Sequence, residues 1–413
     1  MRMDTVIIGG GLSGLACGIA LAKRGQHVTI VASGQSTLLI NGGSMDLLGY
    51  IDGKAVNSPL EAIATLPQSH PYSKIGAERI AALTERVKLL FYDSGISMVG
   101  SADANHWRIT PMGIAKPAWL TLSNHLHIDD LANLPAKRLT LMCVRGFFDL
   151  PNGMMANGLK ELGFDVNVAE FTTDDITALR RSPSEMRAST LSTHLVSRNA
   201  LQRVADEINR LAADDDMALL PSVLADEDAF GTLQSMVSKP LSLISTLPPS
   251  MAGTRMQKLL QHYFRMLGGN YLAGDTAVGG TFEDGRLTGI TTAKQSDTPL
   301  QADNFVLASG SFISRGLKAD NERVYEPVFD LDVDADTDRE QWTRFGVMAP
   351  QAYMRFGVAT DDQFRCSKQG KTIDNLYAIG SVLSGHDALK MSDGTGVSLL
   401  TALAVNDHII AKK

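Results

Sequence analysis

Three glycines near the start of the chain constrain its fold more than any other feature of the sequence. Gly9, Gly11 and Gly14 have the spacing Gly-x-Gly-x-x-Gly. They follow the apolar, β-branched residues 5–8, which are typical of a buried parallel strand, and they precede residues 12–24, which carry apolar side chains at helical spacing. In such a turn the first glycine allows a sharp bend, the second lets backbone N–H groups approach a phosphate, and the third lets the helix pack closely on the strand. The phosphate lies at the helix N-terminus, so the sequence predicts a dinucleotide-binding site here.

Two later segments repeat the pattern of an apolar strand that ends in a glycine. Residues 305–310 end at Gly310, and residues 376–380 end at Gly380, which Ser381 follows. Each segment alone is common in α/β proteins. In this order, after an N-terminal fingerprint, they are typical of flavin-binding proteins with two dinucleotide-binding motifs. The first segment then passes beneath the dinucleotide and the second approaches the flavin.

Small residues in two other loops are expected to lie against the flavin. Gly394, Thr395 and Gly396 precede the final predicted helix, where backbone N–H groups can face the flavin pyrimidine carbonyls. Gly43 and Ser44 follow the second predicted strand and are expected to form a similar loop.

The end of that second strand, predicted at residues 27–31, bears on which flavin is bound. An acidic residue usually stands there and holds the ribose hydroxyls of an adenosine half. Here an alanine and Ser33 occupy the place, and no Asp or Glu occurs between Asp4 and Asp46. Either neutral groups such as Ser33 and Gln35 hold the ribose of FAD, or the flavin is the mononucleotide FMN, which the missing acid favours. No nearby arginine replaces the acid as in an NADP site.

The rest of the chain predicts an α/β fold of the two-dinucleotide-binding type (FAD/NAD(P)-like, Rossmann) with a second α/β domain inserted into it. At 413 residues the chain is longer than a single hydrophobic core usually allows. Residues 60–135 have a mostly helical pattern, Asp284-Gly285 predicts a hairpin turn, and short apolar runs occur at 138–144, 164–169, 217–221 and 241–247. The expected division is a flavin-binding domain at 1–60, 250–311 and 365–413, an inserted domain at 61–249, and a segment at 312–364 that lines the cleft or meets a partner.

Composition argues against several other classes of protein. The net charge of −7, the pI near 5.7 and the lack of a Lys/Arg block argue against a nucleic-acid partner. No run of eighteen or more apolar residues occurs, so we expect a cytoplasmic chain without a membrane span. Cys17, Cys143 and Cys366 are isolated and the histidines show no metal-ligand spacing, so no metal is expected. Any iron–sulfur centre would belong to another subunit.

The sequence offers fewer pointers to catalysis. Oxidation of an alcohol needs a base for the hydroxyl proton while hydride passes to the flavin, and His386, next to Asp387 in a glycine-rich loop, is the best-placed titratable group. Arg255, Arg315 and Arg355 flank segments expected to line the cleft, and they are candidates to bind a substrate phosphate. A histidine without a catalytic role, and arginines that are solvated or ion-paired, are the alternative interpretations.

Segments along the whole chain carry a resemblance to one protein family. Three of them are specific: Gly43-Ser44-Met45-Asp46-Leu47-Leu48, His70-Pro71-Tyr72-Ser73 and Thr246-Leu247-Pro248-Pro249-Ser250. Residues 1–15, 307–312 and 378–383 are similar as well but are generic to flavin-binding folds. On these motifs the chain resembles the B subunit of bacterial anaerobic glycerol-3-phosphate dehydrogenase.

The resemblance implies a flavoprotein with FMN that pairs with a larger, FAD-containing catalytic subunit. This pair would dock on a membrane-bound iron–sulfur subunit, which passes electrons to quinone and places the chain at the periphery of the inner membrane. The implied reaction is oxidation of sn-glycerol 3-phosphate to dihydroxyacetone phosphate in anaerobic respiration. Residues 384–396 depart from the glycine-rich loop without histidine that the family leads us to expect, which bears against a role for His386.

Three other hypotheses stay open. The chain is an electron-transfer and assembly subunit that relays electrons from the partner's FAD without substrate chemistry, which would explain the weak catalytic signals and which we favour for the mechanism. A soluble nicotinamide-dependent flavin reductase is disfavoured because no second complete Gly-x-Gly-x-x-Gly occurs. A ligand-free scaffold is the third, and it predicts a colourless protein.

Overall fold

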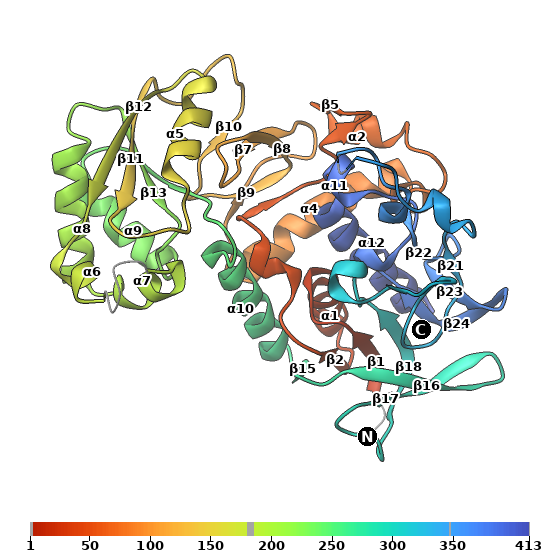
Figure 1. Ribbon diagram of the computed structural model, residues 1–413. Coiled ribbons are helices and arrows are strands. Elements are labelled where there is room, and N and C mark those ends of the chain that lie inside the picture. Colours follow the sequence, from red (N-terminus) through yellow and green to blue (C-terminus); the bar gives the residue numbers. More distant parts are fainter. Residues whose placement is uncertain (1–2, 180–185, 347, 413) are drawn as a thin grey trace.

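The larger of two lobes is built on a mixed sheet (Figure 1). The computed structural model describes residues 3–179, 186–346 and 348–412, and Met1 and Arg2 of the opening segment lie outside them. Within these residues the sheet has eight strands in the order β15-β2-β1-β18-β17-β16, with β24 beside β18 and β23 beside β24. The strands are β1 (Met3–Ile8), β2 (Val28–Ala32), β15 (Asn270–Ala273), β16 (Ala277–Glu283), β17 (Arg286–Thr292), β18 (Leu300–Leu307), β23 (Arg365–Lys368) and β24 (Lys371–Ala378). Segments from both ends of the sequence therefore meet in one sheet.

The predicted strand, glycine turn and helix at the N-terminus are confirmed. β1 lies between two parallel neighbours, β2 and β18, and its residues 6–8 are buried, as a central strand requires. Helix α1 (Leu12–Lys23) begins directly after Gly11. Gly25 has a φ of 78°, the left-handed conformation that ends a helix. The predicted hairpin turn also forms, because Asp284 and Gly285 both have positive φ between β16 and β17.

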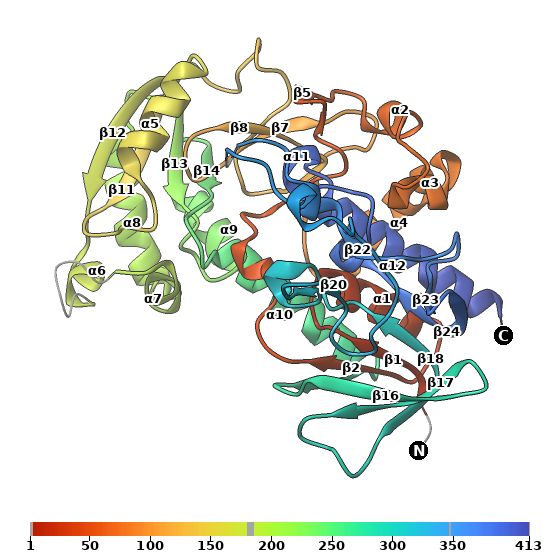
Figure 2. The same cartoon turned by 45° about the vertical axis from the view of Figure 1, so that its right-hand side comes forward.

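Helix α1, which follows the glycine turn, packs against other long helices (Figure 2). α1 contacts both α10 (Met251–Met266) and α12 (Gly394–Ala411), and α12 also packs on α4 (Ala77–Asp93). Every residue of α12 from Gly396 to Asn406 is buried. A helix that is apolar on all sides is one enclosed by protein. None of the helices in the described ranges is long and apolar enough to cross a membrane.

The smaller lobe, at the left of Figure 1, contains a second sheet of four parallel strands in the order β12-β11-β13-β14. Its side chains form a hydrophobic cluster of their own. All four strands were predicted from apolar runs, and the strands are confirmed. The elements of this lobe are β11 (Arg138–Val144), α5 (Asn152–Glu161), β12 (Asp165–Phe171), α6 (Asp174–Ala178), α7 (Ala188–His194), α8 (Arg198–Leu211), β13 (Met217–Pro221), α9 (Glu227–Met236) and β14 (Leu241–Ile244).

The structure of residues 60–135 differs from the expectation of a mostly helical segment. Its first part is helical, but residues 98–128 form short strands, so the helical prediction is wrong there. These strands build two small sheets, β3-β9-β6 and β10-β7-β8. The expected domain boundaries stay a prediction; buried side chains as late as Leu122 pack in the core of the larger lobe. The elements concerned are β3 (Ser44–Met45), α2 (Pro59–Ile63), α3 (Pro71–Ile75), β6 (Met98–Val99), β7 (His106–Ile109), β8 (Ala115–Ala118), β9 (Leu120–Leu122) and β10 (His127–Ile128).

Candidate functional site

A cavity of about 940 Å³ lies where β1, β2 and β18 end and α1 begins. Ligands of open α/β sheets bind at the carboxyl ends of the strands, and small-molecule sites span roughly 300–1,000 Å³. The glycine turn, the segment after β2, the turn after β15 and the segment after β18 all line it. The predicted site residues on its wall are Gly9, Gly11, Ser33, Gln35, Gly310, Arg315 and Ser381.

The glycine turn, called the glycine cradle below, is closely packed at Gly9 and Gly14 and has free space beside Gly11. A Cβ atom at Gly9 would collide with the carbonyl oxygen of Ala308, and one at Gly14 would collide with the carbonyl oxygen of Gly9. At Gly11, by contrast, the nearest atom to an added Cβ is Cβ of Ser36 at 3.8 Å. Gly11 is also the N-cap of α1, and no side chain caps this helix end. Unpaired N–H groups at the helix start are therefore available to an anion in the cavity.

A carboxylate that the sequence did not reveal lies beside the end of β2. Asp275, which follows β15, lines the cavity, and its backbone N–H donates to the carbonyl of Ala32. Its oxygens accept hydrogen bonds from Thr292 Oγ1 at 2.6 Å and from the backbone of Lys294 at 3.0 Å. Burial alone would raise the pKa of Asp275, but these bonds lower it, so the group is ionised at neutral pH. Asp275 is far from β2 in the sequence, so the residues that follow β2 do not indicate it.

The predicted residues Gly380, Gly43 and Ser44 lie away from the cavity wall. Gly380 has a φ of 73°, and an added Cβ would meet Oγ of Ser13 on α1 at 2.6 Å, so this glycine allows close packing behind the turn. Ser44 belongs to β3, where its hydroxyl accepts a hydrogen bond from Thr121 at 2.9 Å. Gly43 has a φ of 98° and packs against neighbouring apolar side chains. Contact of these three residues with a ligand stays a prediction.

The start of α12 is occupied by the backbone of Asp46. The N–H of Gly396 donates to the carbonyl of Asp46 at 2.8 Å, and the hydroxyl of Thr395 accepts from the N–H of Asp46 at 2.6 Å. Gly394 lies against Ala388. The residue of this helix that reaches the cavity is instead found one turn later, at Ser398. A flavin contact of Gly394, Thr395 and Gly396 stays a prediction.

A buried carboxylate between two histidines lies beside the same helix end. Asp393, the N-cap of α12, has one oxygen 2.9 Å from Nε2 of His70 and the other 3.0 Å from Nδ1 of His386. The side chains of His70 and Asp393 are 0% exposed and that of His386 is 3% exposed. Nδ1 of His70 accepts the N–H of Tyr72 at 3.1 Å. Sequence reasoning identified His386 but missed both partners, because His70 lies 323 residues from Asp393.

The charges of this group follow from its burial. Burial alone would raise the pKa of Asp393, but the two imidazoles hold that pKa well below its usual range. Burial lowers the pKa of His70, and the hydrogen bond to Asp393 only partly opposes this effect. The group therefore combines an ionised carboxylate with a neutral His70.

The three predicted phosphate-binding arginines lie in different places. Arg315 lines the cavity, whereas Arg255 on α10 forms an ion pair with Glu227 at 3.1 Å. Arg355 is exposed and lies beside the histidine group, since its carbonyl accepts the N–H of Gly385 and its positive charge lowers the pKa of His70.

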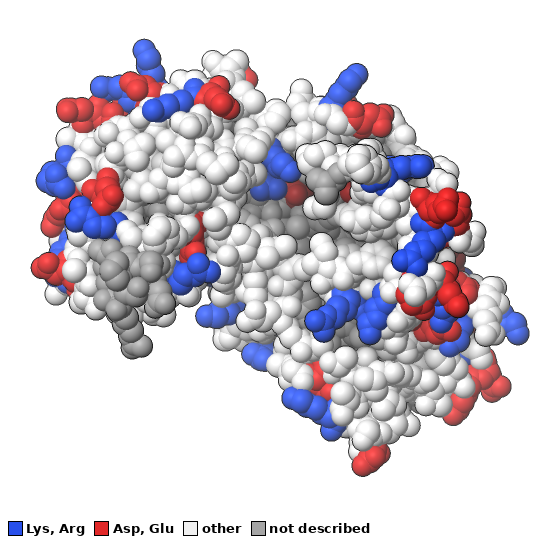
Figure 3. Space-filling view, viewed as in Figure 1, with Lys and Arg blue, Asp and Glu red and all other residues white. Residues whose placement is uncertain are grey.

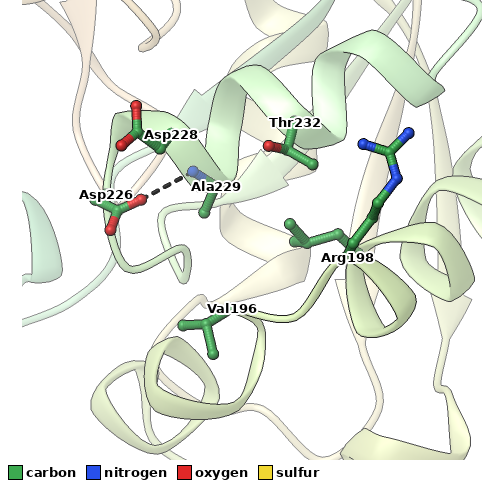
Figure 4. A pocket seen from close by; sticks show the side chains of 7 residues that line it. Val196, Arg198, Asp226, Asp228, Ala229 and Thr232 are labelled. Carbon is green, nitrogen blue, oxygen red and sulfur yellow. Dashed lines mark hydrogen bonds between the residues drawn. The ribbon is translucent and has the colours of Figure 1, made fainter.

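A smaller pocket of about 280 Å³ lies entirely in the smaller lobe (Figure 4). It is formed by the starts of α8 and α9, and Asp226 there caps α9 by accepting the N–H of Ala229 at 2.8 Å. Capping explains this carboxylate without a ligand. On the face in Figure 3, acidic and basic side chains are mixed, and no large patch of one sign is visible.

The amino-acid sequence is similar to those of known proteins along almost its whole length. Residues 4–397 match the family of the FAD binding domain. The chain is 40% identical over 418 residues to the B subunit of anaerobic glycerol-3-phosphate dehydrogenase from Yersinia enterocolitica, which covers 100% of this chain and 99% of that protein. It is 39% identical over 421 residues to the protein of the same name from Pectobacterium carotovorum, which covers 99% of each. The chain belongs to the B-subunit family of anaerobic glycerol-3-phosphate dehydrogenase. Among solved structures it is similar to 3-ketosteroid Δ1-dehydrogenase of Sterolibacterium denitrificans, with 12% identity, full coverage of both chains and a TM-score of 0.45, a likeness too distant to add to this assignment.

Membership of this family confirms the predicted fold, an α/β flavoprotein fold of the Rossmann type, and the class of flavin-dependent oxidoreductases. The family description names FAD, and nothing supports the expected FMN. The word subunit in the names of the relatives implies a complex of several chains.

Proposed function

We propose that this chain is a flavoprotein subunit of the anaerobic respiratory glycerol-3-phosphate dehydrogenase complex and takes part in oxidising sn-glycerol 3-phosphate to dihydroxyacetone phosphate. In this proposal it lies on the cytoplasmic side of the inner membrane with an FAD-containing catalytic subunit, and a membrane-bound iron–sulfur subunit carries the electrons to quinone. The names of its full-length relatives support the complex. The observation that carries the substrate role is the buried hydrogen bond between His386 and Asp393.

We further propose that the cofactor is FAD. The cavity fits FAD, because the glycine cradle has free space at Gly11 and the N–H groups at the start of α1 have no side-chain cap. The cavity also continues past Ser33 to Thr276 and Val278, which leaves room for an adenosine half that FMN lacks. Ser33 and the carboxylate of Asp275 would take the place of the missing acid at the end of β2. When bound, the flavin supplies the acceptor for the hydride that leaves the substrate carbon.

His386 is the proposed base, and its free nitrogen would take the proton of the substrate hydroxyl. Arg355 is the proposed phosphate ligand, because it is exposed beside this histidine. Arg255 is less suited, since Glu227 already neutralises it, and Arg315 lies on the wall of the proposed FAD cavity.

The test is anaerobic addition of sn-glycerol 3-phosphate to the purified, flavin-loaded chain. We expect the wild type to lose its visible flavin absorbance and the His386→Gln variant to keep it. Addition of NADH should leave the spectrum unchanged. A spectrum that responds to glycerol 3-phosphate only when the FAD-containing partner is present would contradict the substrate role and leave the chain as an electron relay.

A further inference from the structure

We propose that Asp393 is a positioning residue that holds His386 as its Nδ1–H tautomer, so that Nε2 is the basic nitrogen, and that His70 locks Asp393 in this orientation. The inference rests on the proposed role of His386. It goes beyond it by naming two residues of other chain segments that act through this histidine.

His70 has only one tautomer compatible with its neighbours. Its Nδ1 accepts the backbone N–H of Tyr72 at the start of α3, so this nitrogen carries a lone pair and no proton. The proton of the neutral ring is therefore on Nε2, which lies 2.9 Å from one oxygen of Asp393. Since the helix backbone fixes the acceptor side of the ring, the donor side is fixed as well.

The second oxygen of Asp393 accepts a hydrogen bond from His386. An ionised carboxylate only accepts hydrogen bonds, so Nδ1 of His386, 3.0 Å away, must donate its proton to it. In the neutral ring of His386 this leaves the lone pair on Nε2. No described residue forms a hydrogen bond with that nitrogen. A substrate hydroxyl could therefore transfer its proton to Nε2, and the carboxylate would stabilise the imidazolium that results.

Close packing preorganises the group before any ligand arrives. Gly385 has a φ of 92°, and a Cβ there would collide with the carbonyl of Ser69, so the backbone next to His386 packs closely on the backbone next to His70. The two imidazole rings lie 6.0 Å apart at 71°. A Cβ at Gly396 would likewise collide with the hydroxyl of Tyr72. The centroid of the Tyr72 ring lies 4.9 Å from that of the His70 ring. The rings therefore have little freedom to turn.

Asp393→Asn tests the positioning role, because an amide has one accepting oxygen and one donating nitrogen. His70 still presents its Nε2–H, so the amide oxygen must face His70. The amide nitrogen then faces His386, whose Nδ1 becomes an acceptor and whose proton moves to Nε2. Nε2 of His386 then can no longer accept a proton, although the side chain at position 393 keeps its shape. We expect the rate of substrate-dependent flavin reduction to fall on the order of 10²- to 10⁴-fold.

The measurement is nitrogen-15 NMR of histidine-labelled full-length chain, which reads the tautomer of each ring without turnover. In the wild type the expected state is Nδ1–H for His386 and Nε2–H for His70, and in Asp393→Asn it is Nε2–H for both. Adding His70→Ala to Asp393→Asn removes the competing donor, frees the amide oxygen for His386 and should restore Nδ1–H. Asp387→Asn is the matched control, since Asp387 caps α11 (Ala388–Met391) and does not bond the ring.

A wild-type His386 on the Nε2–H tautomer would overturn the inference, and so would an unchanged tautomer in Asp393→Asn. The wild-type spectrum alone decides the matter if the variant does not fold. The tautomers could behave as expected while glycerol 3-phosphate fails to reduce the flavin even in the wild type. In that case the hydrogen-bonded positions of the two histidines are confirmed and the proposed function fails.

Discussion

The open position in the glycine cradle gives a prediction that separates ligand binding from folding. In Gly11→Ala the added methyl group would meet only Cβ of Ser36, at 3.8 Å, which is an ordinary van der Waals distance. The backbone of Gly11 has a φ of −82° and a ψ of −168°, which an alanine adopts without strain. The flavin-free chain should therefore keep its free energy of unfolding within about 0.5 kcal/mol of the wild type.

In the proposed FAD site, the same methyl group would lie where a phosphate approaches the N–H groups of α1, since Gly11 lines the cavity. Losing one hydrogen bond to a charged phosphate costs about 1.5–3 kcal/mol, which corresponds to an FAD dissociation constant raised about 10- to 150-fold. The assay is a fluorescence titration of the flavin-free chain with FAD, with thermal unfolding recorded on the same sample.

Gly231→Ala is the control, because Gly231 is an exposed position inside α9 where an added Cβ meets nothing within 4 Å. It should leave FAD binding unchanged and stabilise the chain by about 0.5–1 kcal/mol. A Gly11→Ala chain that binds FAD within about twofold of the wild type would refute the phosphate position, since such a ratio is under 0.5 kcal/mol.

Three further outcomes follow from packing and burial. Gly14→Ala should lower the stability of the flavin-free chain by about 1–3 kcal/mol in urea unfolding, because its methyl group overlaps the carbonyl of Gly9; an unchanged midpoint would contradict the close packing. Burial lowers the pKa of His106 to about 4, and an unfolded histidine binds its proton near pH 6.5, so stability present above about pH 6.5 is lost toward pH 4, on the order of 3 kcal/mol. His106→Gln should remove this loss and exposed His27→Gln should not, as measured by unfolding at each pH. Burial raises the pKa of Cys17 to about 12, and all three cysteines are buried, so a thiol reagent at neutral pH should label them only after denaturation; rapid labelling of the native chain would show an open core.

The N-terminal part of the fold around the candidate cofactor site could be predicted because its signals are local. The β1–α1–β2 unit is encoded by a continuous apolar run, a glycine spacing and helical periodicity within about thirty residues. The same holds for the type I′ turn at Asp284 and Gly285, whose positive φ values follow from residue type.

Short strands and distant pairings could not be predicted in this way. β6 has two residues and β9 has three, and their stability comes from pairing with each other and with β3, more than fifty residues earlier in the chain, rather than from their own periodicity. The pairing of Asp393 with His70 was missed, because this bond joins opposite ends of the sequence. Asp275 was missed for the same reason, since parallel pairing of β15 with β2 brings it to the strand end.

The central claim is that a flavin with an adenosine half occupies the cavity at the start of α1. The most direct measurement is the visible absorption spectrum of the purified chain, followed by heat release of the cofactor and its mass. We predict a yellow protein that releases FAD. Release of FMN would contradict the adenosine position beside Ser33 and Asp275. A colourless protein that neither flavin reconstitutes would contradict the central claim as a whole.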